Sequence, residues 1–320
     1  MSGAVLDDFY TDGQQFEQLY LTGIRKVNCA TDKDTTITKE VVRCLQALPA
    51  EDVDKIYNLV DRKSPLDILP LVVIDGEFLP ASPRDLLAKG NYKTNVNLLS
   101  SVVEDEASFI LALVSGQAQF KPVDPQPITL PEAQGVLAFI TSGRQSISQA
   151  ALNKLYFSGL NADLDISNDL RKRVGIAYGD LILSCPVLDF SKEVFRNSPT
   201  TATVYQWYYT AKLGNLKFLC NQWAGACHCD ELYPAFGMAF RYPDKSTSRE
   251  KEISTEIMTF IKSFLYHGKP TAEQPEWEPF FLSGDNQKVI APYYEINNGF
   301  KKPENFKFNL KELECAVLSH

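Results

Sequence analysis

The chain has 320 residues, 44% of them apolar and 22% charged, a balance typical of a globular protein with a large buried core. Its formal net charge of −8 argues against a nucleic-acid partner and against attachment to an anionic membrane, because both need a basic surface. No apolar run reaches the ~20 residues that a membrane-spanning helix needs, so we expect no membrane span.

Hydrophobic periodicity alternates between helical and strand spacing along the chain, which is the pattern of an α/β protein. In chain order, helices are expected over 36–48, 50–59, 131–142, 146–156, 166–183 and 249–266. Strands are expected over 95–103, 203–210 and 289–296, and a terminal strand or helix over 306–318. A proline-rich connector occupies 65–83, and no repeat or obvious linker divides the chain. We therefore expect one domain over 1–320, with a small sheet and many helices.

The candidate chemistry lies in two polar stretches, Glu104-Asp-Glu-Ala-Ser-Phe109 and Gly225-Ala-Cys-His-Cys-Asp230. They contain Glu106 and His228, the residue types of the acid and the base in a Ser–Glu–His hydrolase. In that chemistry the serine stands on a Gly-x-Ser-x-Gly turn, and this sequence has none. The nearest imitation, Gly175-Ile-Ala-Tyr-Gly179, has alanine at its centre. From these residues alone, a solvated acidic loop and an ordinary loop histidine also explain the two stretches.

Seven cysteines leave two interpretations open, since buried free thiols are typical of a cytosolic protein and disulfides of a secreted one. Cys220, Cys227 and Cys229 bracket His228. Their spacing fits no common zinc site. A local disulfide from Cys220 to Cys227 or Cys229, with one thiol left over, is therefore favoured over a metal site. We expect neither a metal nor a cofactor.

Five segments carry a resemblance to known proteins. In chain order they are Val72-Val-Ile-Asp-Gly-Glu-Phe-Leu-Pro80, Glu104-Asp-Glu-Ala-Ser-Phe109, Gly179-Asp-Leu-Ile-Leu-Ser-Cys-Pro186, the stretch Gly225 to Gly237, and Phe264-Leu-Tyr-His-Gly-Lys-Pro270 followed by Trp277. In order and spacing they resemble the type-B carboxylesterase and cholinesterase family, over nearly the whole chain. The resemblance implies a partial α/β-hydrolase fold: its C-terminal part, with the late strands of the sheet and many helices.

The resemblance also implies roles for single residues. Glu106 would be the triad acid that orients His228, and His228 the general base toward a serine. The serine and the oxyanion-hole donors would lie in an upstream portion, so this chain alone would be inactive. The substrate would be a small-molecule carboxylic ester. A general carboxylesterase is favoured because Leu66 and Ile68 stand where cholinesterases carry aromatic residues, although Phe109 does match an aromatic of the cholinesterase gorge.

In the resembling family two cysteine pairs are bonded, which implies disulfides Cys29–Cys44 and Cys185–Cys315 in this chain. Such bonds imply a secreted parent protein. This chain opens on acidic, polar sequence with no signal peptide, so we expect the peptide in the upstream portion. A homodimer is compatible with the resemblance.

Three departures from the family pattern favour a different interpretation. Ser101, Ala107 and Cys229 each replace a family glycine near the acid or the base, and each adds a Cβ where glycine has free backbone choice. They favour the alternative of a non-catalytic, cholinesterase-like adhesion or binding protein of the neuroligin type. Retention of Glu106 and His228 favours the hydrolase, because a binding protein needs neither residue.

Overall fold

The computed structural model describes residues 10–61, 72–142, 144, 146–160, 166–214, 220, 222–271, 277–297 and 303–318. The chain separates into two compact units, one over Asp8–Leu86 and one that contains Leu87–His320. One cooperative domain over 1–320 stays a prediction.

The smaller unit is a helical cluster with a two-stranded parallel sheet. It contains the following elements: β1 (Tyr10–Asp12), α1 (Gly13–Lys26), α2 (Lys39–Ala47), α3 (Ala50–Leu59) and β2 (Val72–Ile74), with α4 (Pro83–Ala88) at its end. The predicted helices 36–48 and 50–59 are present as α2 and α3. α2 begins after Thr38, whose hydroxyl accepts a hydrogen bond from the N–H of Val41. The apolar core of this unit surrounds the Cys29–Cys44 disulfide.

The larger unit is built on a four-stranded sheet in the order β3-β4-β7-β8. The strands are β3 (Asn97–Val103), β4 (Thr203–Tyr209), β7 (Pro292–Ile296) and β8 (Phe306–Phe308). β4 is parallel to both β3 and β7, and β8 is antiparallel to β7. A separate hairpin pairs β5 (Phe281–Ser283) with β6 (Lys288–Ile290). The α/β class predicted from the sequence is confirmed, with more strands than the three that periodicity indicates.

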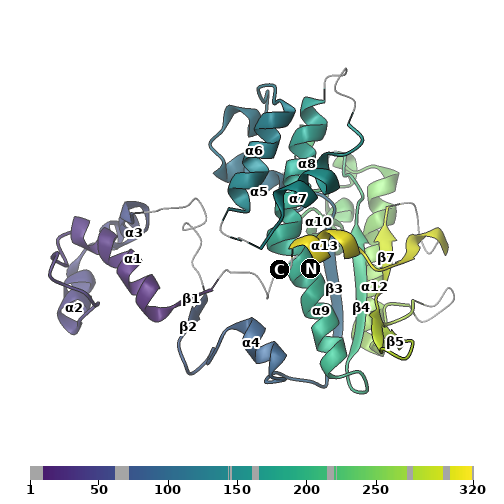
Figure 1. Ribbon diagram of the computed structural model, residues 1–320, viewed down its shortest axis with the longest axis horizontal. Coiled ribbons are helices and arrows are strands. Elements are labelled where there is room, and N and C mark those ends of the chain that lie inside the picture. Colours follow the sequence, from purple (N-terminus) through teal and green to yellow (C-terminus); the bar gives the residue numbers. More distant parts are fainter. Residues whose placement is uncertain are drawn as a thin grey trace. The chain divides into compact units, whose positions relative to one another are not determined.

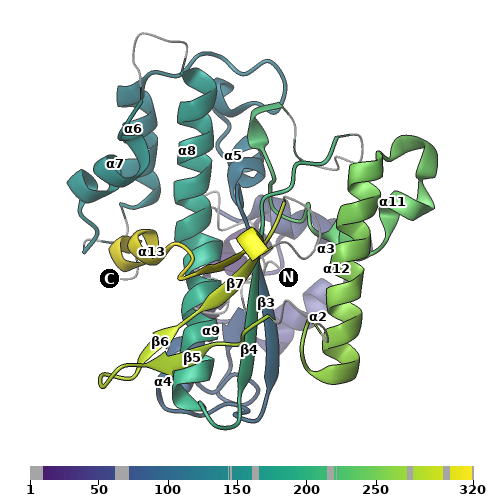
Figure 2. The same cartoon turned by 90° about the vertical axis from the view of Figure 1, so that its right-hand side faces the viewer.

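Helices pack around this sheet (Figure 1). They are α5 (Ser108–Val114), α6 (Leu130–Ile140), α7 (Gln149–Phe157), α8 (Ser167–Gly179), α9 (Cys185–Asn197), α10 (Leu232–Ala235), α11 (Met238–Arg241), α12 (Ser248–His267) and α13 (Glu312–Leu318). The predicted helix 166–183 continues to Asn197, because a π-helical turn over Asp180–Ser184 joins α8 to α9. Figure 2 shows the two helices as one continuous rod. The segment 306–318 contains both a strand and a helix.

Alternation along β4 places α9 and α12 on opposite faces of the sheet. Tyr205, Trp207 and Tyr209 pack with residues of α12 in one core cluster. Val204, one position out of phase, packs with residues of α9 in another. Successive side chains of a strand point to opposite faces. The larger unit therefore has a helix, sheet, helix arrangement.

From the sequence we expected no segment long and apolar enough to span a bilayer. The rod formed by α8 and α9 is long and apolar enough by this measure. Residues Ser167–Asn197 pass that test, and no other helix in the described part of the chain does. Within the fold, 83% of the apolar window is buried. This burial is what a core helix shows.

Candidate functional site

The acid lies in a short turn between β3 and α5. Glu106 is 1% exposed, and its Oε1 accepts a hydrogen bond of 2.8 Å from the N–H of Val103, the last residue of β3. The strand thereby fixes one carboxylate oxygen and leaves Oε2 for another partner. A buried carboxylate needs such partners, because leaving it unpaired is costly.

Helix α8 supports this turn with two glycines. A Cβ at Gly179 would lie 2.8 Å from the Cβ of Glu106, and a Cβ at Gly175 would lie 3.0 Å from the Cα of Ser108. The distance at Gly179 is shorter than real Cβ contacts and the one at Gly175 is tighter than most of them, so glycine at both positions lets the helix approach the acid turn closely. The stretch that imitates a nucleophile turn in the sequence is therefore a helix surface against which the acid turn packs.

The histidine loop, residues 222–231, is attached to the acid turn by two hydrogen bonds between Asp105 and Ala226. Asp105 N–H donates to the carbonyl of Ala226 at 2.9 Å, and Ala226 N–H donates to Oδ2 of Asp105 at 2.9 Å. Gly225 has φ +67°, and a Cβ there would lie 1.9 Å from that same Oδ2. Glycine is required at this position both for its backbone conformation and for the close approach. Asp105 and Gly225 thus position the base relative to the acid.

His228 faces the acid across this junction. Its Nδ1 lies 2.7 Å from Oε2 of Glu106, and its side chain is 22% exposed. Because a carboxylate only accepts, Nδ1 carries the proton of this bond and the second ring nitrogen, Nε2, is left for chemistry. Burial opposes the charged ring, but hydrogen bonds and charges from Cys229 and Glu106 outweigh it and raise the pKa of His228 to about 10.

Of the three residues that replace family glycines, only Cys229 occupies a backbone region that favours glycine. Ser101 lies in extended β3, and Ala107 has φ −101°. Cys229 has φ +75°, carries a free thiol and directly follows His228 in the chain. The strand and turn geometry is therefore compatible with the first two substitutions, while the third changes the immediate surroundings of the base.

Lys172 of α8 forms ion pairs with two carboxylates of the acid turn. Its Nζ lies 3.4 Å from carboxylate oxygens of both Glu104 and Asp105. Burial nevertheless raises the pKa of Asp105 to about 7, against the opposing effect of Lys172. Sequence reasoning missed Asp105, Lys172 and Gly225. The sequence showed the acidic cluster, but it did not show which of the carboxylates faces the histidine loop.

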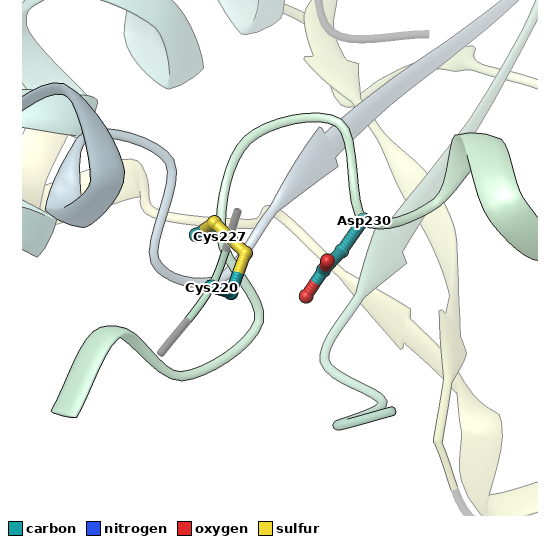
Figure 3. A group of neighbouring side chains, drawn as sticks. All are labelled: Cys220, Cys227 and Asp230. Atoms are coloured by element: carbon teal, nitrogen blue, oxygen red, sulfur yellow. A yellow bond between two sulfur atoms is a disulfide. The ribbon is translucent and has the colours of Figure 1, made fainter. Parts of the chain in front are cut away.

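The structure joins Cys220 to Cys227 and leaves Cys229 free, one of the two local pairings left open by the sequence. Sulfur atoms of Cys220 and Cys227 lie within 4.8 Å of a carboxylate oxygen of Asp230 (Figure 3). Zinc binds thiolates, and the disulfide removes both of these as ligands. The zinc interpretation of the three cysteines is therefore not supported by their arrangement.

The remaining predicted residues divide as follows. Phe109 lies in α5 and packs against the Cys220–Cys227 disulfide, beside the histidine loop. Leu66 and Ile68 lie outside the described residues. The pairs Cys29–Cys44 and Cys185–Cys315, which the resemblance implied, are both present as disulfides.

A surface hollow of about 380 Å³ lies along α7, α8 and α13, with Tyr156, Lys172 and Glu314 among its lining residues. Neither Glu106 nor His228 lines it. The acid–base contact is the stronger candidate for the functional site, because it brings together groups that can move a proton.

Comparison with known proteins gives one consistent result. The model of the carboxylesterase family matches residues 1–318. Acetylcholinesterase from Bungarus fasciatus is 26% identical over 300 residues, which are 92% of this chain and 46% of that protein. Acetylcholinesterase from Leptinotarsa decemlineata is 24% identical over 281 residues, 88% of this chain and 43% of that protein. The chain thus spans less than half the length of these relatives.

Proposed function

The chain belongs to the carboxylesterase family, and from this premise we propose that it is the C-terminal part of a serine carboxylic ester hydrolase, in which Glu106 is the triad acid and His228 the general base. The α/β fold is the one expected of that family. The proposed substrate is a small-molecule carboxylic ester. The absence of a nucleic-acid partner and the presence of a homodimer stay predictions.

The observation that carries this proposal is the bond of 2.7 Å between Nδ1 of His228 and the buried Oε2 of Glu106. Glu106 holds the ring in one tautomer and stabilises the charged ring that forms during the reaction. Nε2 then takes the proton of a serine hydroxyl and later passes it to the departing alkoxide. Catalysis of this kind needs a nucleophile on the Nε2 side of the ring.

The nucleophile of the proposed hydrolase lies in another portion of a longer protein, since these 320 residues contain no Gly-x-Ser-x-Gly turn. Two observations support this assignment. The relatives extend well beyond the matched region. Among the described strands, β3 pairs only with β4, so its other side is free to pair with a further strand of the sheet. By itself, the chain is then expected to lack ester turnover.

We further propose that the parent protein is extracellular. Three disulfides support this location, because such bonds persist in oxidising compartments. General carboxylesterase activity remains our preferred specificity, with Leu66, Ile68 and Phe109 as the proposed pocket residues.

One observation favours the second candidate, a non-catalytic cholinesterase-like binding protein. Cys229, which directly follows the base, holds a left-handed backbone conformation (φ +75°) at a position where the family pattern has glycine. The two candidates differ in whether a serine elsewhere in the native protein reacts.

The test begins with the native transcript, whose 5′ sequence gives the upstream coding region. The protein that it encodes is expressed and treated with a fluorophosphonate probe and with p-nitrophenyl butyrate. We expect one labelled serine outside the present chain. Glu106→Gln is expected to lower kcat/KM by roughly 10⁴-fold, because the amide favours the wrong tautomer. His267→Gln, in the exposed last turn of α12, is the matched control and should leave the rate unchanged.

The proposal fails if the folded native protein neither reacts with the probe nor hydrolyses the ester. The binding-protein candidate would then be preferred.

A further inference from the structure

Asp105 is a buried carboxylate that shares one cation with a second carboxylate. Its Oδ1 lies 3.4 Å from Nζ of Lys172, and the same Nζ lies 3.4 Å from Oε2 of Glu104. Two carboxylates and one ammonium leave one negative charge in excess. The side chain of Glu104 is 28% exposed to water, whereas that of Asp105 is 0% exposed. The cost of the excess charge therefore falls on Asp105, and a buried carboxyl group avoids this cost by taking up a proton.

The two oxygens of this carboxylate have different surroundings. Oδ2 accepts a hydrogen bond of 2.9 Å from the N–H of Ala226 in the histidine loop. Within the described part of the chain, no donor is placed to hydrogen-bond with Oδ1. A proton can therefore add to Oδ1 without breaking the bond that Oδ2 accepts.

The groups around Asp105 come from three further elements. Lys172 of α8 favours the charged form, and Glu104 of the acid turn opposes it. Tyr208 of β4 is neutral, because burial and nearby carboxylates raise its pKa. Cys227, whose backbone pairs with that of Asp105, is in a disulfide and does not titrate. Burial is the largest of these effects and raises the pKa of Asp105 to about 7.

We propose that Asp105 positions the histidine loop through a proton: the loop is held most firmly when Asp105 is neutral, and it is loosened as Asp105 ionises. Glu106 directly follows Asp105, and His228 lies two residues after Ala226. The contact of Asp105 with Ala226 thus sets the distance between the acid and the base. Asp105 is a positioning residue that makes the site respond to pH. Its effect on ester turnover rests on the proposed function, whereas the pH response of the loop does not.

The direction of the response follows from where the proton binds. If the loop separates from the acid turn, water reaches Asp105 and its pKa returns toward the ordinary value of 3.8. With the loop attached, the pKa is about 7. Between these values the attached loop holds a proton that the separated loop lacks. The attachment is therefore strongest below about pH 4, weakens about tenfold per pH unit up to about pH 7, and is then constant.

Lys172 limits this loss of attachment. Its charge stabilises ionised Asp105 and so lowers the pH at which the weakening ends. Without that charge, the pKa of Asp105 would be higher still, and the weakening would continue to a higher pH. Lys172 acts on the base only through Asp105, because its ion pairs are with the acid turn.

The test is amide hydrogen exchange in the full 320-residue chain, labelled with 15N-alanine and followed by NMR between about pH 5.5 and 9. The Ala226 amide is the donor to Oδ2, so the opening that exposes it to exchange also exposes Asp105. We expect its protection factor, the slowing of exchange relative to a free peptide, to fall about tenfold per pH unit up to about pH 7 and then to level off. The Ala202 amide, bonded to the carbonyl of Ser198, is the internal control and should keep a constant protection factor.

The variants separate the proton from the ion pair. Asp105→Asn keeps an oxygen that can accept from Ala226 but cannot ionise, so the protection factor should be constant over the whole range. Lys172→Met should extend the tenfold fall above pH 7, and Lys172→Arg, which keeps the charge, should restore the levelling near pH 7. Lys154→Met, at an exposed position of α7, is the matched control and should follow the wild type.

The base is observed in the same samples. The proton on Nδ1 of His228, which Glu106 holds, exchanges with water faster when the loop is loose. The ratio of its exchange rate in the wild type to that in Asp105→Asn should increase from about pH 5.5 to 7. An unchanged ratio would mean that the loop does not transmit the state of Asp105 to the base, and the positioning role would be wrong.

Three results for the amides would overturn the inference. One is a protection factor of Ala226 that is constant with pH in the wild type, which would mean that Asp105 keeps one charge state. Another is an equal fall in Asp105→Asn, which would assign the response to a different group. A third is an equal fall at Ala202, which would show that the whole unit opens with pH and not the histidine loop.

Failure of the proposed function gives a different result. If Ala226 shows the expected response while the native protein has no fluorophosphonate-reactive serine, the role of Asp105 stands and the serine hydrolase falls. If the native protein has such a serine while the protection of Ala226 is independent of pH, the serine hydrolase stands and the role of Asp105 falls.

Discussion

Two regions of the larger unit contain the same parts and use them differently. In the acid–base site, the buried Glu106 faces His228, and the Cys220–Cys227 disulfide closes the adjacent loop. In the region that we call the C-terminal lock, the buried Asp180 faces Lys311, with Tyr156 and the Cys185–Cys315 disulfide beside the pair. Each region is a buried carboxylate, a basic side chain and a disulfide.

The difference lies in what the basic group can still reach. In the lock, Lys311 Nζ lies 2.7 Å from Oδ1 of Asp180 and its side chain is 8% exposed. The hydroxyl of Tyr156 donates to Oδ2 at 2.9 Å, so both carboxylate oxygens have partners. In the acid–base site, the base keeps one ring nitrogen beyond its carboxylate partner, and its side chain is 22% exposed. A buried charge pair therefore indicates chemistry only when the base retains an accessible atom for it.

Removal of the two disulfides, one at a time, gives the largest expected difference in stability between the two regions. Loop entropy predicts that Cys185→Ala/Cys315→Ala, which opens a loop of 130 residues, destabilises the chain by about 5 kcal/mol. Cys220→Ala/Cys227→Ala opens a loop of 7 residues and should cost about 2 kcal/mol. Urea unfolding measures both. Equal losses would mean that the lock does not constrain the unfolded chain more than the site does.

Removal of the ion pair in the C-terminal lock gives the next largest expected loss of stability. Lys311→Met leaves the Asp180 carboxylate buried without its counter-charge and should cost roughly 3–5 kcal/mol of unfolding free energy. Lys288→Met removes an exposed pair to Glu312 and serves as the matched control, with an expected loss of at most ~1 kcal/mol. Equal losses in the two variants would mean that the buried ion pair stabilises the chain no more than the exposed one.

Gly225→Ala tests the fit between the acid turn and the histidine loop. The added Cβ would lie 1.9 Å from Oδ2 of Asp105 and would sit at φ +67°. We expect a loss of roughly 1–3 kcal/mol from overpacking in addition to the backbone strain. Gly284→Ala, at φ +70° with no atom within 4 Å of its Cβ, isolates the strain. Gly225→Ala should therefore have the lower urea midpoint of the two variants. Identical midpoints would contradict the close approach.

The pH dependence of stability gives the effect that is most specific to the acid–base site. The pKa of His228 is raised from 6.5 to about 10 in the folded chain, so its stabilising contribution is fully present below pH 6.5 and is lost as the pH rises toward 10. The difference in unfolding free energy between the wild type and His228→Gln should therefore shrink over this range, by at most about 1.4 kcal/mol per pH unit. His267→Gln should keep the wild-type profile. A constant difference would mean that the ring is not charged in the folded state.

Several features were determined by the sequence itself. Strong periodicity predicted helices such as 50–59 and 249–266, which are present as α3 and α12. Glu106 and His228 stood out because their neighbours resemble a family motif, and the structure brings them within hydrogen-bonding distance. The helices depend on residues close together in the chain, where spacing carries the information, whereas the acid and the base were identified through the resemblance.

Other features were decided only by the tertiary structure. No local pattern relates Asp180 to Lys311, or Gly225 to the carboxylate of Asp105, yet these contacts form the lock and position the site. Gly179 resembled part of a catalytic turn and is instead the surface on which the acid turn packs. Cys229 was one of three nearby cysteines until the fold paired the other two. These outcomes depend on which distant segments the sheet and the α8–α9 rod bring together, and close packing, unlike periodicity, is a property of the whole chain.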